Sequence, residues 1–315
     1  MTISQPWDKR SAAMLRATTF TDWLLLTFLV AAWGSAFVMM KVAVTHLDAA
    51  WVMALRLAVA ALLLIPYSLI AGEKLAAPPG VWGKFTWLGF IGHALPFFLI
   101  SWGTFHVSSG VSGLLMAAIP LFIIVLAHLF LPDEPLTLPK TVGFLLGFVG
   151  IVILIGPDRL LGLSFEGHAL AGQIAILAGC LCYAIHAITA QRLGFETPVK
   201  QAAGVCLAAA LMGVIFAVAT SPAGLVGKPP IAFLAVAGLG VVPTALATLV
   251  MYRLLSRMGP SFVAYSNYLV PPFAVVLGAI ILGERLDWRI GVALVLILGG
   301  IAITRLPPGE IRPSN

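Results

Sequence analysis

Four side chains that carry a positive charge, or that titrate near neutral pH, lie inside long apolar stretches: Lys41, Arg56, His93 and His186. All 12 acidic residues lie in polar segments or at the ends of apolar stretches. A charge at the centre of a membrane helix costs roughly 2.5 to 3.5 kcal/mol on insertion scales, so an ionisable residue there is a candidate for function. These four are the residues with which such a chain could bind a polar solute. Coupling to protons or sodium through a buried carboxylate has no candidate residue.

Lys41 and Arg56 each allow two interpretations. Lys41 lies near the end of its apolar stretch, where its long stem can reach the lipid headgroups. Alternatively, Trp33, Phe37 and Lys41 recur every four residues and share one helix face, which would present aromatic rings and a cation to an amphipathic substrate. Arg56 lies about eight residues, or roughly 12 Å, below the membrane surface. It either hydrogen-bonds to freed backbone carbonyls or binds a substrate carboxylate.

Histidine and tyrosine supply the next candidates. His93 lies close to the middle of the stretch 85–106, one helical turn before Pro96. It is either a hydrogen-bond donor between helices or, at this depth beside a kink, the best single candidate for substrate contact. Tyr183 and His186 are one turn apart, so their rings face the same way. We therefore expect both side chains in the lining of a substrate cavity.

Prolines interrupt the apolar stretches at places that match between the two halves of the chain. They are Pro96 and Pro120 in the first half, and Pro243 and Pro271-Pro272 in the second. A membrane proline frees the carbonyl four residues earlier, which bends the helix and leaves a hydrogen-bond acceptor. Each proline is either a mechanical kink or, because the positions are paired, a hinge or a flank of the site. Near the freed carbonyls, Met116, Asn267 and Tyr268 are predicted lining residues.

One catalytic motif is present. Gly110-Val-Ser112-Gly113 matches the G-x-S-G motif of rhomboid-type intramembrane serine proteases, with His186 as a base further along the chain. Four such residues recur easily by chance in an apolar chain rich in glycine. The structural alternative is a stripe of small residues from Ser109 to Met116 that lets one helix pack closely on another. We favour the stripe, and expect no enzyme, because an internal repeat runs through the whole chain and has no role in a protease.

Composition sets the class of protein. The chain has 315 residues, of which 61% are apolar and only 10% charged, and its mean hydropathy is +1.06. A soluble domain carries about 25% charged residues, so a soluble enzyme is excluded. A spanning helix needs roughly 20 apolar residues, and ten stretches meet this requirement. They are 22–44, 49–71, 85–106, 109–131, 138–156, 168–190, 199–220, 230–252, 260–282 and 288–304. The three cysteines lie inside these stretches and are expected to be buried apolar residues, so neither a metal nor a cofactor is implied.

The basic residues mark the orientation of the chain. With the N-terminus inside the cell, twelve Lys and Arg fall on the cytoplasmic side and four on the external side. This asymmetry follows the positive-inside rule and predicts that both termini are cytoplasmic. The net charge of +6 then reports topology, and binding to nucleic acid is not expected. The first 20 residues are polar and basic, which predicts a cytoplasmic tail over 1–21 and no signal peptide.

The two halves of the chain share a series of motifs. Pro120-Leu-Phe-Ile-Ile-Val-Leu, Glu134-Pro-Leu136 and Gly150-Ile-Val-Ile153 correspond to Pro271-Pro-Phe-Ala-Val-Val-Leu, Glu284-Arg-Leu286 and Gly300-Ile-Ala-Ile303. With five helices each, the repeats 22–157 and 168–305 must enter the membrane in opposite directions, with an external linker over 158–167 and a cytoplasmic tail over 306–315. The Glu134 loop is then cytoplasmic and the Glu284 loop external. Inverted repeats are typical of secondary transporters, whose substrate site lies near the midplane between the halves.

At this point the chain resembles a known family. Trp33-Gly-Ser-Ala-Phe37, Arg56 and the paired Pro, Glu-x-Leu and Gly-Ile elements resemble the EamA-type members of the drug/metabolite transporter superfamily, over nearly the whole chain. The resemblance implies ten helices, export of small metabolites, and a central cavity formed by the first four helices of each repeat, with the fifth packed outside. Within the family the chain looks most like the bacterial amino-acid exporters. It departs at Cys182-Tyr183, where a Trp often stands, and at Ala293, which corresponds to a glycine in the first half.

We therefore expect an all-α exporter of the bacterial inner membrane, a monomer whose partners are a small-molecule substrate and the lipid bilayer. An amino acid, aromatic or otherwise apolar, would bind around Trp33, His93 and Tyr183 and leave by alternating access. Without a buried acid, facilitated diffusion or exchange is favoured over a proton antiport through histidine. The alternative function is export of cationic drugs or toxic organic compounds by proton antiport, and a passive channel or scaffold is a further alternative.

Overall fold

The computed structural model describes most of the chain. The described ranges are 19–73, 75–130, 137–155, 168–193, 197–221, 224–258, 260–263 and 266–303. The predicted linker, the C-terminal tail, the loop with Glu134 and residues 1–18 lie outside them. Within these ranges every regular element is a helix, in agreement with the predicted all-α class.

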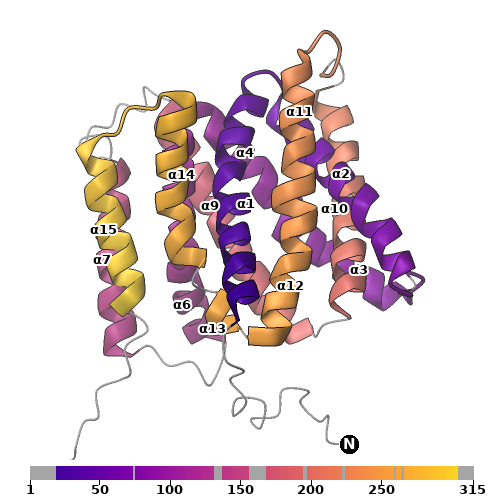
Figure 1. The fold of residues 1–315 in the computed structure, drawn as a ribbon, viewed down its shortest axis with the longest axis horizontal. Coiled ribbons are helices and arrows are strands. Elements are labelled where there is room, and N and C mark those ends of the chain that lie inside the picture. Colours follow the sequence, from indigo (N-terminus) through magenta and orange to yellow (C-terminus); the bar gives the residue numbers. More distant parts are fainter. Residues whose placement is uncertain are drawn as a thin grey trace, which may run out of the picture.

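The first half contains two continuous helices, two interrupted ones and a final helix. Their bounds are α1 Phe20–Val44, α2 Ala49–Ile70, α3 Pro79–Gly89, a π-helical turn η2 Phe90–Ala94, α4 Leu95–His106, α5 Ser109–Leu115, a 3-10 turn η3 Met116–Ala118, α6 Ile119–Phe130 and α7 Leu138–Ile155. We name the two ends of the bundle after α1. The Phe20 side is where α1 begins, and the Val44 side is where α1 ends (lower and upper in Figure 1).

The second half repeats this layout over its described residues. Its helices are α9 His168–Leu193, α10 Pro198–Thr220, α11 Pro230–Leu239, a π-helical turn η4 Gly240–Leu246, α12 Ala247–Met258, α13 Pro260–Val263, α14 Ser266–Leu282 and α15 Trp288–Ile303. The π-helical turn η4 interrupts the third segment of this half, as η2 interrupts the third segment of the first half.

Three of the predicted prolines lie at these irregular turns. Pro96 is the second residue after η2, Pro120 is the second residue after η3, and Pro243 lies within η4. A proline has no backbone N–H to donate, and a locally wider or tighter turn lets the neighbouring groups find other partners. At Pro243, the freed carbonyl of Leu239 accepts a hydrogen bond from the Thr244 hydroxyl at 2.7 Å. The break in the helix is therefore compensated by a side chain.

Helices from the two halves pack against each other (Figure 1). α2 packs along α10, α4 along α9, and α1 along both α14 and α11. α7 and α15 pack on each other at one edge of the bundle, on the left in Figure 1. The halves therefore contact each other through their earlier helices in the interior of the bundle and through their last helices, α7 and α15, at its edge.

The helices suit a membrane in length and composition. Seven segments are long and apolar enough to cross one: Phe20–Val44, Ala49–Ile70, Pro79–His106, Ser109–Phe130, His168–Ala190, Val199–Thr220 and Pro230–Met251. Three apolar helices are shorter over the described residues: Leu138–Leu154, Leu269–Leu282 and Trp288–Ile303. Each of these segments falls on one predicted stretch. The third begins at Pro79, six residues earlier than predicted, because proline is well tolerated in the first turn of a helix.

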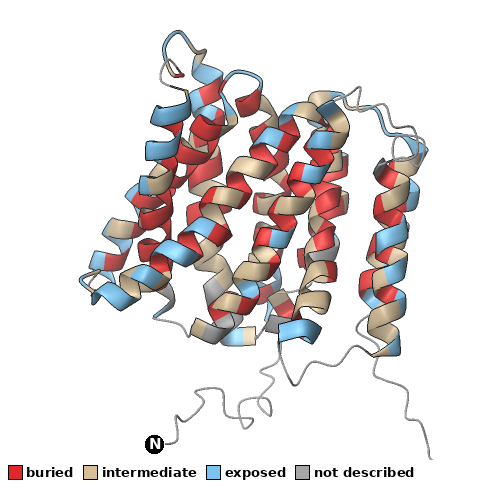
Figure 2. Cartoon of the chain, turned by 180° about the vertical axis from the view of Figure 1, so that it is seen from behind, coloured by how far each residue is buried: buried red, intermediate tan, exposed pale blue. Residues whose placement is uncertain are grey.

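The outer surface is apolar. Large side chains such as Leu62, Ile280 and Val295 are exposed, and residues of the exposed class face outward from the bundle in Figure 2. Buried residues line the inner faces of the same helices. A surface of this kind suits contact with lipid tails.

Candidate functional site

A buried arginine links the two halves of the chain. Arg56 on α2 is 6% exposed. Its Nε–H donates a hydrogen bond to Oγ1 of Thr244 in η4 at 2.8 Å. The central carbon of its guanidinium group lies 3.8 Å from the centre of the Phe97 ring on α4, a cation–π contact that is strongest when the cation is desolvated. The guanidinium group is thus held by elements of both halves.

Thr244 can accept this hydrogen bond because its own hydroxyl proton is donated to a different acceptor. The hydroxyl donates to the carbonyl of Leu239, which leaves the oxygen lone pairs for Arg56. The approach of α2 also requires Gly240, since a Cβ at this position would lie 2.5 Å from Cβ of Val59. The π-helical turn around Pro243 therefore determines where the arginine is held.

Two histidines face each other across the halves. The ring centres of His93 in η2 and His186 in α9 are 6.0 Å apart, and His93 lies 5.6 Å from the Phe97 ring. Gly92 permits this approach, because a Cβ there would overlap the imidazole of His186. Nδ1 of each histidine is buried and has no hydrogen-bond partner among the described residues. Each imidazole therefore offers a nitrogen that can donate or accept a hydrogen bond, according to its tautomer.

Tyr183 on α9 completes the group. Its ring centre lies 6.4 Å from that of Phe97, and the side chain packs against two apolar clusters. We call the following residues the central cluster: Arg56, His93, Phe97, Tyr183, His186 and Thr244. The structure thus brings together four residues that the sequence singled out separately.

The central cluster contains a cation, Arg56, and no acidic residue. No carboxylate of a described residue lies within ion-pair distance of Arg56, and its terminal amino groups have no hydrogen-bond partner in the described part of the chain. A guanidinium fork binds a carboxylate through two parallel hydrogen bonds. The cluster can therefore accept an anionic group beside aromatic rings and imidazoles.

Lys41 lies elsewhere and is engaged with the backbone. Its Nζ donates to the carbonyl oxygens of Thr104 at 2.8 Å, Phe105 at 3.0 Å and Val107 at 2.6 Å. An ammonium group has three protons, so these bonds use all of its donors. Lys41 therefore caps the end of α4 on the Val44 side, a role that neither interpretation of the sequence included.

Other predicted lining residues pack between helices. Phe37 is 6% exposed and contacts α5 closely at Gly113. The Met116 sulfur lies 3.8 Å from Sγ of Cys180. Trp33 is half-buried and packs against two apolar clusters along α1. The side chains of Asn267 and Tyr268 lie outside the described part of the structure, and Pro271 is inside α14.

The protease arrangement is absent from the described residues. The Ser112 hydroxyl donates to the carbonyl of Ser108 at 3.1 Å, one helical turn earlier. The ring of His186 lies against His93 and Gly92 instead of this serine. The described residues also contain no group of three or more side chains that could hold a metal ion.

Two members of the central cluster, Phe97 and Thr244, were not predicted from the sequence. Phe97 is one helical turn after His93, and Thr244 follows Pro243 directly. Two sequence features point to them: Phe97 shares a helix face with the candidate His93, and Thr244 stands beside a membrane proline. Their partner Arg56 lies 188 residues from Thr244 in sequence, so only the fold reveals the contact.

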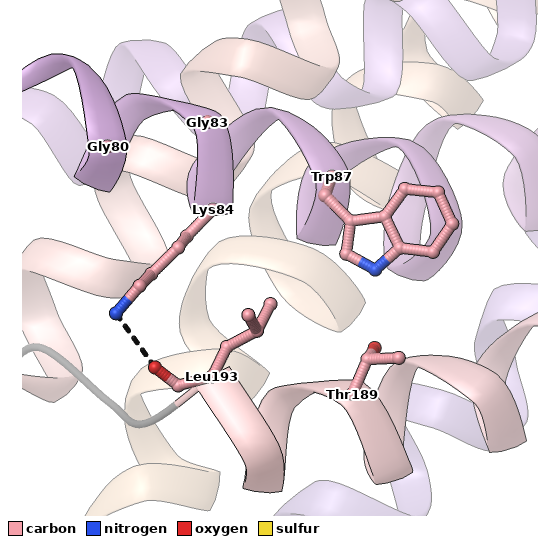
Figure 3. Close-up of a pocket in the computed structure, with 6 residues that line it drawn as sticks. All are labelled: Gly80, Gly83, Lys84, Trp87, Thr189 and Leu193. Atoms are coloured by element: carbon pink, nitrogen blue, oxygen red, sulfur yellow. Dashed lines mark hydrogen bonds between the residues drawn. The ribbon is translucent and has the colours of Figure 1, made fainter.

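A pocket of about 560 Å³ lies away from this cluster, between α3 and the end of α9 on the Phe20 side (Figure 3). Its lining residues are Gly80, Gly83, Lys84, Trp87, Thr189 and Leu193. Nζ of Lys84 donates to the carbonyl of Leu193 at 2.8 Å and so caps α9. The absence of side chains at the two glycines leaves the space open.

Comparison with known proteins identifies relatives among transporters. An uncharacterized transporter of Archaeoglobus fulgidus is 30% identical over 43% of this chain and 48% of its own length. The aromatic amino acid exporter YddG of Ancylobacter novellus is 27% identical over 58% of this chain and 63% of its own. The uncharacterized inner membrane transporter YedA of Escherichia coli is 26% identical over 87% of both. The chain thus spans about half to two thirds of the first two relatives.

The fold and the family follow from two further matches. A crystal structure of a protein that is 21% identical matches with a TM-score of 0.65, over 91% of this chain and 97% of that one, so the fold is shared. The model of the EamA-like transporter family matches residues 21–156 and again 170–306. This is a multi-pass membrane protein, and the chain belongs to the EamA-like transporter family.

Proposed function

We propose that this protein is a secondary transporter that exports small carboxylate-bearing metabolites, amino acids first among them, by alternating access. The observation that carries the proposal is the buried guanidinium group of Arg56, whose terminal amino groups have no partner among the described residues. Thr244 and Phe97 are neutral, so the charge of the buried guanidinium group is not balanced by an acidic residue in the described part of the chain, and an anionic substrate group would pair with it. The activity named for the Ancylobacter relative, export of aromatic amino acids, supports the same substrate class.

The neighbours of Arg56 suit an amino acid with an apolar side chain. Phe97 and Tyr183 provide rings against which such a side chain packs. The unpartnered nitrogens of His93 and His186 are available to the polar groups of the substrate. A cationic drug would instead meet the positive charge of Arg56, so the central cluster does not favour export of cationic compounds.

The proposed architecture is ten membrane crossings in two inverted repeats, with both termini cytoplasmic and the Val44 side external. Contacts between the halves support it, because each has a counterpart with the halves exchanged. α4 packs on α9 as α11 and α12 pack on α1, and α6 packs on α9 as α14 packs on α1. Two-fold related repeats produce this pattern. The charge asymmetry and the inner membrane named for the E. coli relative support the orientation and the location. We propose that one chain is sufficient for transport.

The test is counterflow in proteoliposomes that contain the full chain. The substrates are amino acids, the amines that match them without the carboxylate, and cationic dyes. We expect saturable exchange of amino acids only. Arg56→Gln abolishes it, and Arg56→Lys reduces it, because lysine lacks the planar fork. The control Lys228→Gln removes a positive charge from the connection between α10 and α11 and leaves transport unchanged.

Two results would overturn this assignment. Equal exchange of the amines and of the amino acids would show that no carboxylate is recognised. Full exchange by folded Arg56→Gln protein, measured after size-exclusion chromatography, would remove Arg56 from the site.

A further inference from the structure

A carboxylate from the second half is bound at the start of α5 in the first half. Glu284 lies in the connection between α14 and α15, and its two oxygens accept hydrogen bonds from the backbone N–H groups of Ser109 at 2.6 Å and Gly110 at 2.9 Å. These two residues begin the long segment that runs from α5 through α6. A helix has unpaired N–H groups and partial positive charge at this end, so a carboxylate suits it.

Small residues make room for this carboxylate. A Cβ at Gly278 on α14 would lie 2.5 Å from Oε2 of Glu284 and 2.6 Å from Oγ of Ser109. A Cβ at Gly110 would lie 3.3 Å from the same Oε2. The space occupied by the carboxylate is thus formed by glycines from both halves, and a larger side chain at Gly278 would displace it.

A cation holds the other end of the connection between α4 and α5. Lys41 on α1 binds the last carbonyls of α4, as described above, and only Val107 and Ser108 separate α4 from α5. The C-terminus of a helix carries partial negative charge, so the ammonium group suits α4 as the carboxylate suits α5. The two opposite charges therefore hold the α4–α5 connection from α1 and from the loop that follows α14.

The contact of Glu284 is more than a local helix cap. α5 already has a cap of its own, because the Ser108 hydroxyl accepts a hydrogen bond from the N–H of Val111. Glu284 adds a bond between the halves, 175 residues away in sequence. Its side chain is partly exposed, so water can take over its hydrogen bonds when the helices separate.

We propose that Glu284 is the gate residue of the transport cycle on the Val44 side. Its carboxylate closes this side by holding the start of α5 against α14, and it releases the two N–H groups each time the halves separate there. The inference rests on the proposed alternating access, which requires the halves to part on one side at a time. In this structure the gate, made of Glu284, Ser109 and Gly110, is closed.

The experiment measures access to a position behind the gate. Ser112 is fully buried one turn further along α5, and Ser112→Cys changes its side chain little. This reporter is placed in the full chain with Cys180, Cys182 and Cys206 replaced by alanine. The rate of labelling by a membrane-impermeant maleimide added from outside is then measured in cells. We expect Glu284→Gln to raise it about tenfold or more, because a neutral amide oxygen is a weaker acceptor than a carboxylate.

The matched control is Asp287→Asn, which neutralises a carboxylate in the same connection without touching α5. The Asp287 side chain accepts a hydrogen bond from the N–H of Arg289, and its loss leaves the labelling rate unchanged. If Glu284→Gln does not fold, Glu284→Asp takes its place, because the shorter side chain keeps the charge and cannot reach both N–H groups. An unchanged labelling rate in a folded Glu284 variant overturns the proposal.

The readout separates this inference from the substrate assignment. Labelling requires no transported substrate. Faster labelling of the Glu284→Gln protein, together with no amino-acid exchange by the unaltered protein, would keep the gate and refute the substrate class. A faster reaction only from the cytoplasmic side would refute the external location of the gate.

Discussion

Thr244→Val tests whether the π-helical turn holds Arg56 in place for its substrate. Valine has the same shape as threonine but lacks the hydroxyl, so the change removes the acceptor for Nε of Arg56 and the donor to the Leu239 carbonyl. Side-chain hydrogen bonds in membranes average about 0.6 kcal/mol and reach about 1.7 kcal/mol. Because the bond from Arg56 is charge-assisted and 2.8 Å long, we take the upper end of that range.

A loss of about 1.5 kcal/mol corresponds to roughly a tenfold weaker interaction. We therefore expect KM for exchanged amino acids to rise about tenfold in Thr244→Val, with a smaller effect on the maximal rate. Thr244→Ser keeps the hydroxyl and restores KM. The assay is concentration-dependent counterflow in proteoliposomes, with thermal unfolding measured in parallel.

Thr248→Val is the matched control. The Thr248 hydroxyl also donates to a helix carbonyl, that of Thr244, at 2.5 Å, but it does not contact Arg56. Its removal affects stability without the tenfold change in KM. If both valine variants changed KM equally, or if Thr244→Val left it unchanged, Thr244 would not position Arg56 for the substrate.

Three further predictions concern packing and capping. Gly300→Ala lowers the free energy of unfolding by about 1 to 3 kcal/mol, because the new Cβ would lie 2.5 Å from the carbonyl oxygen of Gly143. Gly299→Ala is the control in thermal unfolding, since a Cβ at that position meets open space. Lys41→Met removes three hydrogen bonds from the end of α4 and lowers the melting temperature, and an unchanged value would show that water replaces the ammonium group. Gly92→Ala pushes the His186 imidazole away from its present position and reduces exchange of amino acids, which counterflow with normal amounts of folded protein checks.

The helical segments follow from sequence because the bilayer imposes a local rule. Every predicted stretch corresponds to an apolar helix, since backbone groups in lipid must pair within their own segment. The boundaries were less accurate, as the start at Pro79 shows. Three of the predicted prolines, Pro96, Pro120 and Pro243, marked the places where helices change to π-helical or 3-10 turns, because a missing N–H is visible in the sequence itself, whereas Pro271 and Pro272 lie inside α14.

The candidate site was predictable only in part. Arg56, His93, Tyr183 and His186 stood out because ionisable and polar side chains are rare in apolar stretches, and the structure brings them together. Thr244 did not stand out, because a threonine hydroxyl is inconspicuous until its arginine partner is known.

Lys41 shows most directly which properties follow from the sequence and which depend on the tertiary structure. The sequence by itself determined that the chain is a membrane protein, where its apolar segments lie and which few residues carry charge inside them, because each of these depends on neighbouring residues in the chain. Whether such a charge is available to a substrate depends on distant segments. The end of α4 lies beside Lys41 and occupies its three donors, whereas no carboxylate of a described residue lies beside Arg56. Only the packing of helices far apart in sequence decided that Lys41 uses all of its donors on the backbone, whereas Arg56 uses Nε for Thr244 and has no acidic partner among the described residues.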